Sequence, residues 1–190
     1  MSYKRAAKKI GASVLIMLFW LLSFFFRFQT IAEILSIVPG SAGKFARFCF
    51  YSEYLQSVGK KVIFSFGSII TDTRTIIGDR VRIGPNNTIG YCVIGDDALF
   101  AQSVHILSGS NQHGYLRTDI PINQQTGTIS KVEIGKDCWL GANTVVLASV
   151  GAGCVVGSGS VVVREVRDYS VVAGNPARVL KSRVSGAADS

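Results

Sequence analysis

The chain has 190 residues, 48% of them hydrophobic, and a formal net charge of +8 at pH 7. Its length allows one repeat domain preceded by a separate N-terminal segment. Residues 1–61 hold nine Lys and Arg against two Asp and Glu, whereas the remainder of the chain is nearly neutral. This placement argues against a nucleic-acid-binding surface on the repeat domain and favours a membrane surface as the partner of residues 1–61.

The N-terminal segment contains an uncharged run of 17 residues, IGASVLIMLFWLLSFFF, over residues 10–26. A membrane-spanning helix needs about 20 apolar residues, so the run is marginal for a span. No small-residue cleavage site follows it, which argues against a secretory signal. Because basic residues flank the run on both sides, we expect both ends to stay cytoplasmic. The segment then either dips into the membrane and returns through residues 30–38, or lies along the interface.

Pro39-Gly40 ends this part, and residues 42–58 are expected to form a further helix with one apolar side. The alternative is that these helices only pack on the repeat domain. We predict a helical segment over residues 1–61 that is peripheral or monotopic at the cytoplasmic face of a bacterial inner membrane.

From Ile77 the sequence repeats in steps of six residues that begin with an aliphatic residue, usually followed by Gly. The steps run from Ile77 to Ile106 and again from Ile134 to Val162. Their fifth position is small or β-branched, at Val81, Val93, Ala98, Val104, Cys138, Thr144, Cys154 and Ser160. A period of six is the signature of a parallel β-helix. We therefore expect a mainly β fold over residues 62–183, with one long apolar core.

One long segment, residues 108–131, interrupts the period with the polar, Gly-containing sequence SGSNQHGYLRTDIPINQQTGTISK. A loop of this length in a compact domain is usually functional or disordered. It carries His113, Arg117 and Asp119, so we favour a functional loop. The coils resume at residue 132, a final strand and a turn at residues 174–176 follow, and residues 184–190 are expected to be a flexible tail.

The sequences CWLGANTVVL, VVGSGSVV and YSVVAGNPARVLK, between residues 138 and 181, resemble the acetyl-CoA-binding end of sugar O-acetyltransferases. These enzymes belong to the hexapeptide-repeat acyltransferases, whose fold is a left-handed parallel β-helix. The N-terminal IVPGSAGKFARFCFYSEYL and the loop sequence SGSNQHG resemble membrane-associated members found with exopolysaccharide and O-antigen synthesis. The short turn at residues 147–150 departs from the soluble galactoside-type pattern, which has two more residues there.

The resemblance implies a homotrimer, with acetyl-CoA in each groove between neighbours and the loop reaching across to the adjacent subunit. It places His113 at the position of the catalytic base, a role that suits imidazole because its pKa lies near the working pH. Asn86 resembles the asparagine that contacts the acceptor, although asparagine also favours turns. The alternative for His113 is a solvated loop histidine.

Three further residues are candidates for substrate contacts. His105 lies on a regular coil just before Ile106 and is either a polar contact or structural. Arg117 could hold an anionic group of the acceptor, such as a diphosphate or an acidic sugar, and Asp119 could orient His113. A solvated surface role is the alternative for Arg117.

The resemblance also implies the residues that hold acetyl-CoA. Gly141, Ala142, Ser158 and Gly159 would lie along the pantetheine arm, near Trp139, which is more often a packing residue. Basic residues at the end of the chain would hold the CoA phosphates: Arg164, Arg178 and Lys181.

The remaining chemistry is limited. Four cysteines, at 49, 92, 138 and 154, show no CxxC spacing, so we expect free thiols in a reducing compartment. The chain has two histidines, whereas a zinc carbonic anhydrase of this fold needs three, so we expect no metal.

The sequence thus predicts acetyl-CoA-dependent O-acetylation of a sugar hydroxyl at the cytoplasmic membrane face. The acceptor is a polysaccharide or lipid-linked glycan precursor, and His113 acts as general base in a direct transfer. N-acetylation of an amino sugar and a non-catalytic β-helical scaffold remain as alternatives.

Overall fold

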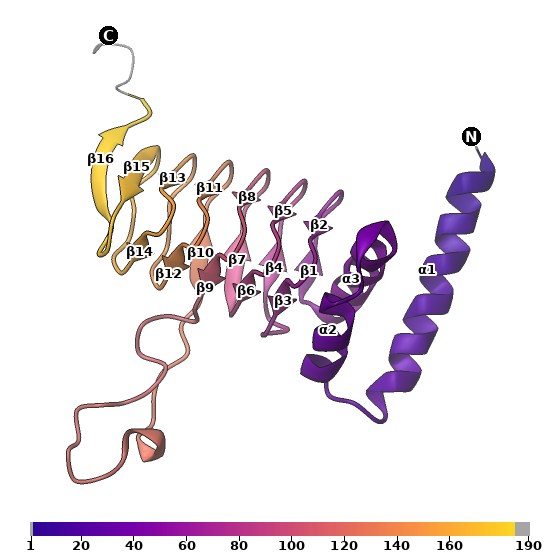
Figure 1. Cartoon of the computed structure of the whole chain (residues 1–190), viewed down its shortest axis with the longest axis horizontal. Coiled ribbons are helices and arrows are strands. Elements are labelled where there is room, and N and C mark those ends of the chain that lie inside the picture. Colours follow the sequence, from indigo (N-terminus) through magenta and orange to yellow (C-terminus); the bar gives the residue numbers. More distant parts are fainter. Residues whose placement is uncertain (1, 185–190) are drawn as a thin grey trace.

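A computed structural model of the chain describes residues 2–184, with side chains for residues 11 and 13–184. Three helices come first: α1 (Ser2–Ser23), α2 (Phe28–Ser36) and α3 (Gly40–Tyr54). Short strands then wind into a prism with three flat faces, and the helices cover one end of it (Figure 1). The predicted mainly β solenoid with N-terminal helices is confirmed. Its left-handed winding is an expectation from the family resemblance.

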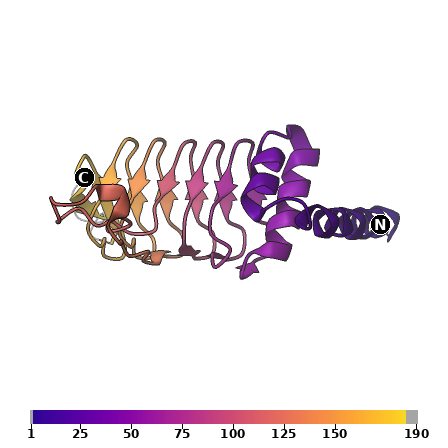
Figure 2. The same cartoon turned by 90° about the horizontal axis from the view of Figure 1, so that it is seen from below.

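Each face of the prism is one sheet, and each of the first four coils contributes one strand to each sheet. Beyond β10, the face of sheet A continues only as isolated bridges at Val150 and Val166. Sheet A contains β1 (Ser57–Val58), β4 (Ile76–Ile77), β7 (Cys92–Ile94) and β10 (Val132–Ile134). Sheet B contains β2 (Ile63–Phe64), β5 (Arg82–Ile83), β8 (Leu99–Phe100), β11 (Trp139–Leu140), β13 (Val155–Val156), β15 (Ser170–Ala173) and β16 (Arg178–Ser182). Sheet C contains β3 (Ile69–Ile70), β6 (Thr88–Ile89), β9 (His105–Ile106), β12 (Val145–Val146) and β14 (Val161–Val162). Figure 2 shows the strands following one another along the prism.

The coils stack in register, so that residues at one place in the repeat lie above one another. In sheet B, Ile83 pairs with Phe100, which pairs with Leu140. All three are fully buried, whereas their preceding residues point outward. Aliphatic residues from the three faces therefore fill one continuous core, and small buried residues at the edges let the chain turn.

Backbone turns at two edges of the prism require left-handed φ angles. Where sheet A passes into sheet B, this position holds Lys61, Arg80, Asp97, Asp137, Gly153 and Tyr169. Where sheet B passes into sheet C, it holds Gly67, Asn86, Ser103, Asn143 and Gly159. We call these the A–B edge and the B–C edge. Gly, Asn and Asp tolerate this region best, which explains much of the composition of both edges.

Arg47 joins the helices to the first coil. Its side chain is fully buried, and its Nη1 donates to the carbonyls of Leu35 (2.8 Å), Ser36 (3.3 Å) and Val38 (2.8 Å) at the C-terminal end of α2. Its Nε donates to the carbonyl of Phe64 in β2 (3.1 Å). The carbonyl ends of a helix attract a cation, so this charge is stabilised without a carboxylate.

Aromatic side chains fill the rest of this joint. The Phe28 and Phe50 rings stack at 5.2 Å, and Tyr51 lies 4.7 Å from Phe64 of the first coil. The Tyr51 hydroxyl accepts a hydrogen bond from the Ile70 N–H, at 3.1 Å. Because that hydroxyl is buried, the pKa of Tyr51 rises to about 12.

The helical segment differs from the expectation at its end. The helix predicted through residue 58 ends at Tyr54, and Ser57–Val58 pair with Ile76–Ile77 as the first strand of sheet A. At these residues, the hydrogen bonds of strand pairing with the next coil are more favourable than another turn of helix. Within residues 2–184, no helix combines the length and the apolar character needed to cross a membrane.

Replacing Arg47 by Ala should destabilise the protein by about 2–4 kcal/mol, because buried carbonyls of α2 and β2 lose their donor. Urea unfolding followed by circular dichroism measures the loss. Lys44→Ala, on the exposed side of the same helix, is the control and should change little. An Arg47→Ala protein as stable as the wild type would show that the joint does not depend on this side chain.

Alkaline pH should weaken the same joint through Tyr51. Between pH 10 and about 12 the unfolded chain releases the Tyr51 proton while the folded protein retains it, so stability falls as pH rises. At pH 11 this contribution is about 1 kcal/mol relative to pH 8. Tyr51→Phe should be less stable at pH 8 and lose less between pH 8 and 11, whereas Tyr115→Phe should follow the wild type. Parallel pH profiles for wild type and Tyr51→Phe would contradict this account.

Candidate active site

The long loop leaves the prism between β9 of sheet C and β10 of sheet A, which places its root at the edge opposite sheet B. Figure 1 shows it extending away from the coils, with a 3-10 helix (Ile122–Gln124) near its tip. The two halves of the loop are hydrogen-bonded to each other near the root. The N–H of Ser130 donates to the Ser108 carbonyl at 2.9 Å, and the N–H of Thr128 donates to the Asn111 carbonyl at 2.6 Å. These hydrogen bonds give the loop a defined conformation, and we call residues 108–131 the arm.

His113 lies on this arm, with an exposed side chain. It lines a cavity of about 240 Å³ together with Asn111, Gly114, Tyr115, Leu116, Thr126, Gly127 and Thr128. Gly127 is required here, because a Cβ at that position would lie 2.5 Å from the His113 backbone nitrogen. The close approach of the two halves of the arm thus fixes the backbone that carries the His113 imidazole.

Arg117 and Asp119 form an ion pair with each other. The Arg117 guanidinium holds the pKa of the Asp119 carboxyl below its usual range. Gln125 ties the same turn by accepting from the Arg117 N–H (3.1 Å) and donating to its carbonyl (2.7 Å). The structure therefore brings Arg117 and Asp119 together, and it shows the Asp119 carboxylate on Arg117 rather than on His113.

His105 and Asn86 lie on the prism itself. His105 is half-buried on the outer side of sheet C, between Thr88 and Val145 of the neighbouring coils. Asn86 is exposed at the B–C edge, where its φ of 57° identifies it as a turn residue. Its side chain lies over Gly67, whose Cβ would approach the Asn86 Oδ1 to 2.0 Å.

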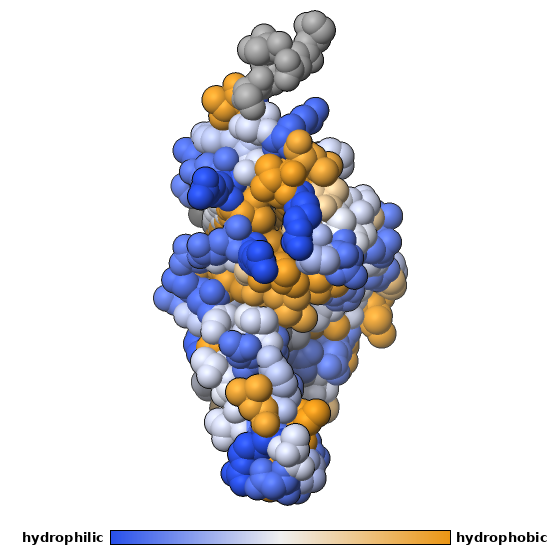
Figure 3. Space-filling model, turned by 90° about the vertical axis from the view of Figure 1, so that its left-hand side faces the viewer, coloured by the Kyte–Doolittle hydropathy of each residue, from blue (hydrophilic) through white to orange (hydrophobic). Residues whose placement is uncertain are grey.

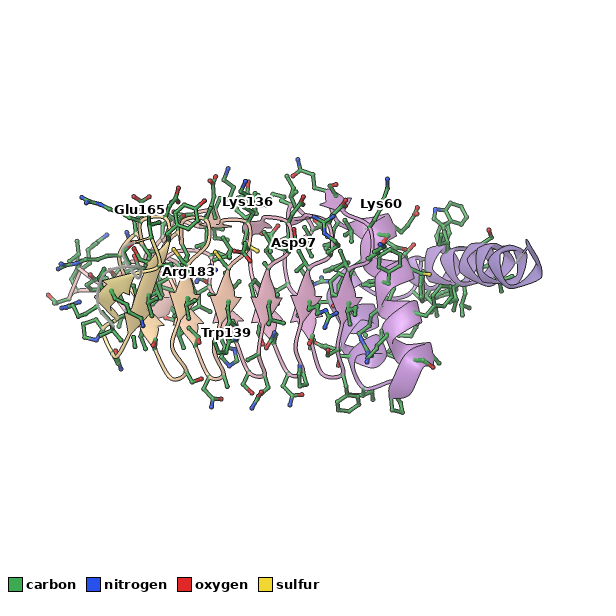
Figure 4. The ribbon with its side chains drawn as sticks, turned by 90° about the horizontal axis from the view of Figure 1, so that it is seen from above. Lys60, Asp97, Lys136, Trp139, Glu165 and Arg183 are labelled. Carbon is green, nitrogen blue, oxygen red and sulfur yellow. The ribbon has the colours of Figure 1, made fainter. Side chains whose placement is uncertain are left out.

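The residues predicted to hold the pantetheine arm lie together. Gly141 and Ala142 follow β11, Ser158 and Gly159 follow β13, and both pairs lie on the B–C edge, one coil apart. A Cβ at Gly141 would lie 2.6 Å from the Ser158 backbone nitrogen, whereas Gly159 has no atom within 4 Å of its Cβ direction. Trp139 stands on the adjoining face, 52% exposed, in the row of sheet B strands (Figure 4).

The basic residues predicted for the CoA phosphates lie near the C-terminal end. Arg164 and Arg178 line one cavity of about 180 Å³. Lys181 is on β16, paired opposite Val171 of β15. Figure 3 faces this end of the molecule and shows hydrophilic and hydrophobic surface side by side there.

The candidate residues fall into two groups on different edges of one protomer. His113 is on the arm rooted opposite sheet B, whereas Trp139, Gly141 and Ser158 lie on sheet B and the B–C edge. Within one chain, the His113 imidazole and the strip of small residues therefore lie at different edges of the prism.

Sequence reasoning missed a basic groove at the other end of sheet B. A cavity of about 520 Å³ is lined by Lys61, Ile63, Arg80, Arg82, Asp97, Ala98 and Leu99. Arg80 forms a two-point pair with Asp97 (2.6 and 2.8 Å), which holds the pKa of Asp97 below its usual range. The sequence signal for this groove is a pair of basic residues 19 positions apart, Lys61 and Arg80. A search for the six-residue repeat does not detect it.

The four cysteines are buried and free. Burial raises the pKa of Cys92 to about 12 and that of Cys138 to about 11. Such thiols are not thiolates near neutral pH, so neither is suited to act as a nucleophile. Among the residues that the structure describes, no group of three His, Cys, Asp or Glu could hold a metal ion.

Comparison with known proteins agrees with the repeat. The family model "Hexapeptide repeat of succinyl-transferase" matches residues 131–164. A probable acetyltransferase of Mycobacterium tuberculosis is 37% identical over 111 residues, which are 56% of this chain and 36% of that protein. The chain thus spans about a third of this relative.

Solved structures show the same fold. The maltose O-acetyltransferase of Clostridium difficile matches with a TM-score of 0.56 and 23% identity, over 81% of this chain and 85% of that one. A point mutant of the N-acyltransferase AntD of Bacillus cereus, in complex with dTDP and coenzyme A, matches with a TM-score of 0.58 and 20% identity, over 67% and 73%. The comparisons thus show the hexapeptide repeat over residues 131–164 and the β-solenoid fold, both of which the resemblance predicted.

Proposed function

We propose that the protein is an acetyl-CoA-dependent O-acetyltransferase that modifies a sugar hydroxyl. The observation that carries the proposal is that the chain combines an ordered arm bearing His113 with a strip of small residues. The strip consists of Gly141, Ala142, Ser158 and Gly159. The M. tuberculosis relative is a probable acetyltransferase, and the neighbours include a maltose O-acetyltransferase and an enzyme in complex with coenzyme A.

The chemistry needs one base and a way to hold two substrates. Neutral His113 accepts the proton of the sugar hydroxyl as its oxygen attacks the thioester carbonyl carbon. The C–S bond then breaks, and the imidazolium returns the proton to the CoA sulfur. The products are an acetyl ester and CoA with a free thiol. No covalent enzyme intermediate is needed.

We propose that the active unit is a homotrimer. The two groups of candidate residues face different directions on one protomer, so a complete site needs the arm of one copy and the strip of another. A threefold ring of parallel prisms places each arm against the next copy. Exposed apolar side chains on the arm, Tyr115 (63%), Leu116 (86%) and Ile122 (59%), support burial against that neighbour.

We further propose that the helices hold the enzyme on the cytoplasmic face of the bacterial inner membrane. α1 packs on α3 through Leu15, Phe19 and Leu22. Its other side exposes Val14, Met17, Leu18, Trp20 and Leu21, and the turn after it exposes Phe24, Phe25 and Phe26. The same helix begins with Lys4, Arg5, Lys8 and Lys9, which complement an anionic leaflet. A polysaccharide or lipid-linked glycan precursor is then the acceptor.

An amino group is the alternative acceptor, because it uses the same donor and base and AntD is an N-acyltransferase. Mild alkali separates the two. An acetyl ester on the product hydrolyses, whereas an acetamide remains, and mass spectrometry reads the difference.

The function is tested with His113→Ala. Loss of the base should lower kcat by about 10²- to 10⁴-fold with little change in KM for acetyl-CoA. The assay follows release of the CoA thiol in the presence of saccharide acceptors and membranes. Circular dichroism checks that the variant is folded. Equal turnover by wild type and His113→Ala would exclude His113 as the base, and wild-type protein that transfers to no saccharide would argue for a scaffold.

A site shared between copies predicts complementation. His113→Ala lacks the base, and Ala142→Trp fills the place of the pantetheine arm, so each should be inactive alone. Co-expressed at equal amounts, they should recover about a quarter of wild-type activity, since that share of sites pairs an intact arm with an intact strip. Absence of any recovery in a mixed oligomer, verified with two affinity tags, would place the whole site in one protomer.

Membrane binding is tested by flotation with lipid vesicles. The triple variant Trp20→Ser, Phe24→Ser and Phe25→Ser should bind anionic vesicles more than about tenfold more weakly than wild type. Val179→Ser removes one exposed apolar side chain at the other end of the prism and is the control. Wild-type binding should be weaker on neutral vesicles. Unchanged flotation of the triple variant would refute α1 as the anchor.

A further inference from the structure

The basic groove at the N-terminal end of sheet B has two columns of residues from successive coils. Lys61, Arg80 and Asp97 occupy the same place on the A–B edge, and Ile63, Arg82 and Leu99 occupy the outward place on β2, β5 and β8. The columns face one cavity of about 520 Å³. Its floor is partly apolar, through Ile63, Ala98 and Leu99, and its other lining residues are charged.

Two cations in this groove differ from the third in having no carboxylate beside them. Arg80 is neutralised by Asp97 and lies 3.6 Å from carboxylate oxygens of both Asp79 and Asp96. Lys61 and Arg82 are exposed, and neither side chain forms an ion pair or hydrogen bond with the side chains and backbone that the structure describes. The groove therefore presents two cations without an ion pair, Lys61 and Arg82, beside Arg80, which three carboxylates surround.

Backbone conformation gives a second, independent reason to single out Lys61. Its φ of 61° lies in the left-handed region, where a long side chain is strained, and other coils place Arg80, Asp97, Asp137, Gly153 or Tyr169 there. Arg80 has the same backbone strain, but its ion pair with Asp97 offsets that strain. Lys61 has no such gain within the described protein. A strained residue of this kind is a reason to look for a ligand.

The groove lies in line with the candidate cofactor strip. Arg82 pairs with Leu99, and Leu99 pairs with Trp139, so Arg82 is two coils from Trp139 on one face. Two coil spacings of about 4.8 Å give roughly 10 Å. A sugar unit and a phosphate attached to it bridge such a separation.

The two ends of the prism carry separate basic groups. Arg164, Arg178 and Lys181 lie towards the C-terminal end, whereas Lys61 and Arg82 lie towards the helices. Figure 4 shows Lys60, the neighbour of Lys61, at the helical end, with Trp139 between it and the C-terminal strands. Coenzyme A needs cations for its phosphates at one end only. The other end is then left for an anionic acceptor.

We propose that the Lys61–Arg82 groove binds the diphosphate of a saccharide diphosphate acceptor, an inference that rests on the proposed acetyl transfer to a sugar. The acceptor lies along sheet B with its sugar near Trp139 and its diphosphate on Lys61 and Arg82. The adjacent helices, which carry the proposed membrane face, suit a diphosphate linked to lipid. A nucleotide diphosphate sugar presents the same chemistry.

Binding is measured first with inorganic pyrophosphate, titrated calorimetrically into the full-length protein in detergent. Excess CoA is present, so the C-terminal basic group is occupied. Lys61→Asn tolerates the left-handed backbone and Arg82→Gln retains most of its stem, so the double variant should fold. We expect it to bind pyrophosphate at least tenfold more weakly than wild type. The matched control, Lys60→Gln with Lys136→Gln, removes two charges outside the groove lining and should bind like wild type.

The assignment is overturned if wild type does not bind pyrophosphate, if the double variant binds it equally well, or if the matched control shows an equal loss. If the double variant instead weakens CoA binding, measured without pyrophosphate, the groove holds the CoA phosphates and the assignment is wrong. Circular dichroism and the urea midpoint establish that the double variant is folded.

Measuring acetyl transfer by the double variant tests the groove assignment separately from the proposed function. With a saccharide diphosphate the double variant should show a KM raised at least tenfold with little change in kcat, and with a neutral saccharide it should match wild type. Comparing a prenyl-diphosphate saccharide with a nucleotide diphosphate sugar identifies the source of the diphosphate. If transfer fails with every saccharide while pyrophosphate binding depends on Lys61 and Arg82, the proposed function fails and the groove stands. If transfer proceeds with unchanged KM in the double variant, the groove assignment fails alone.

Discussion

In-register stacking of the coils is the constraint on which the rest of the structure depends. Backbone N–H groups of Ile63, Arg82 and Leu99 donate to carbonyls of the next coil. A one-residue error in this pairing would move every inward side chain to the surface. This rigid register places Arg82, Leu99 and Trp139 in one row, and it places Gly141 one coil from Ser158. Because the register fixes these positions, the site is determined by which coil a residue belongs to, and the arm is the one long departure from it.

The joint between helices and coils gives the prism a direction. Arg47 connects α2 and β2 through carbonyls on both, and the ring contacts of Phe28, Phe50 and Tyr51 continue into Phe64. Since the exposed apolar side of α1 is fixed on this joint, it is also fixed relative to sheet B. A membrane surface held by α1 would then lie at the Lys61 end of the row, away from Arg164 and Arg178.

The repeat made the coils and the loop boundaries predictable, because hexad spacing depends only on local steric fit. The slip after Ile89 shows the limit. Counting in sixes makes Val93 the fifth residue of its hexad, but the shortened step buries Cys92 and leaves Val93 half-buried. The end of α3 was missed for a similar reason, since Ser57–Val58 are strand only because the next coil is present to pair with them. Side-chain pairing on the arm was equally out of reach: the Arg117–Asp119 pair depends on a turn held by Gln125.

The groove was not predictable from the hexads, because its residues are the outward and edge positions that the repeat leaves free. Those positions are where a repeat protein can vary without loss of the core, and function gathers there. Lys61, Arg80 and Tyr169 all depart from the Asp and Gly that suit this backbone. Of the two cations, Arg80 has Asp97 beside it, whereas Lys61 faces open space lined by Arg82. The ion pair with Asp97 thus accounts for Arg80, and the unpaired charge of Lys61 is what an anionic acceptor would neutralise.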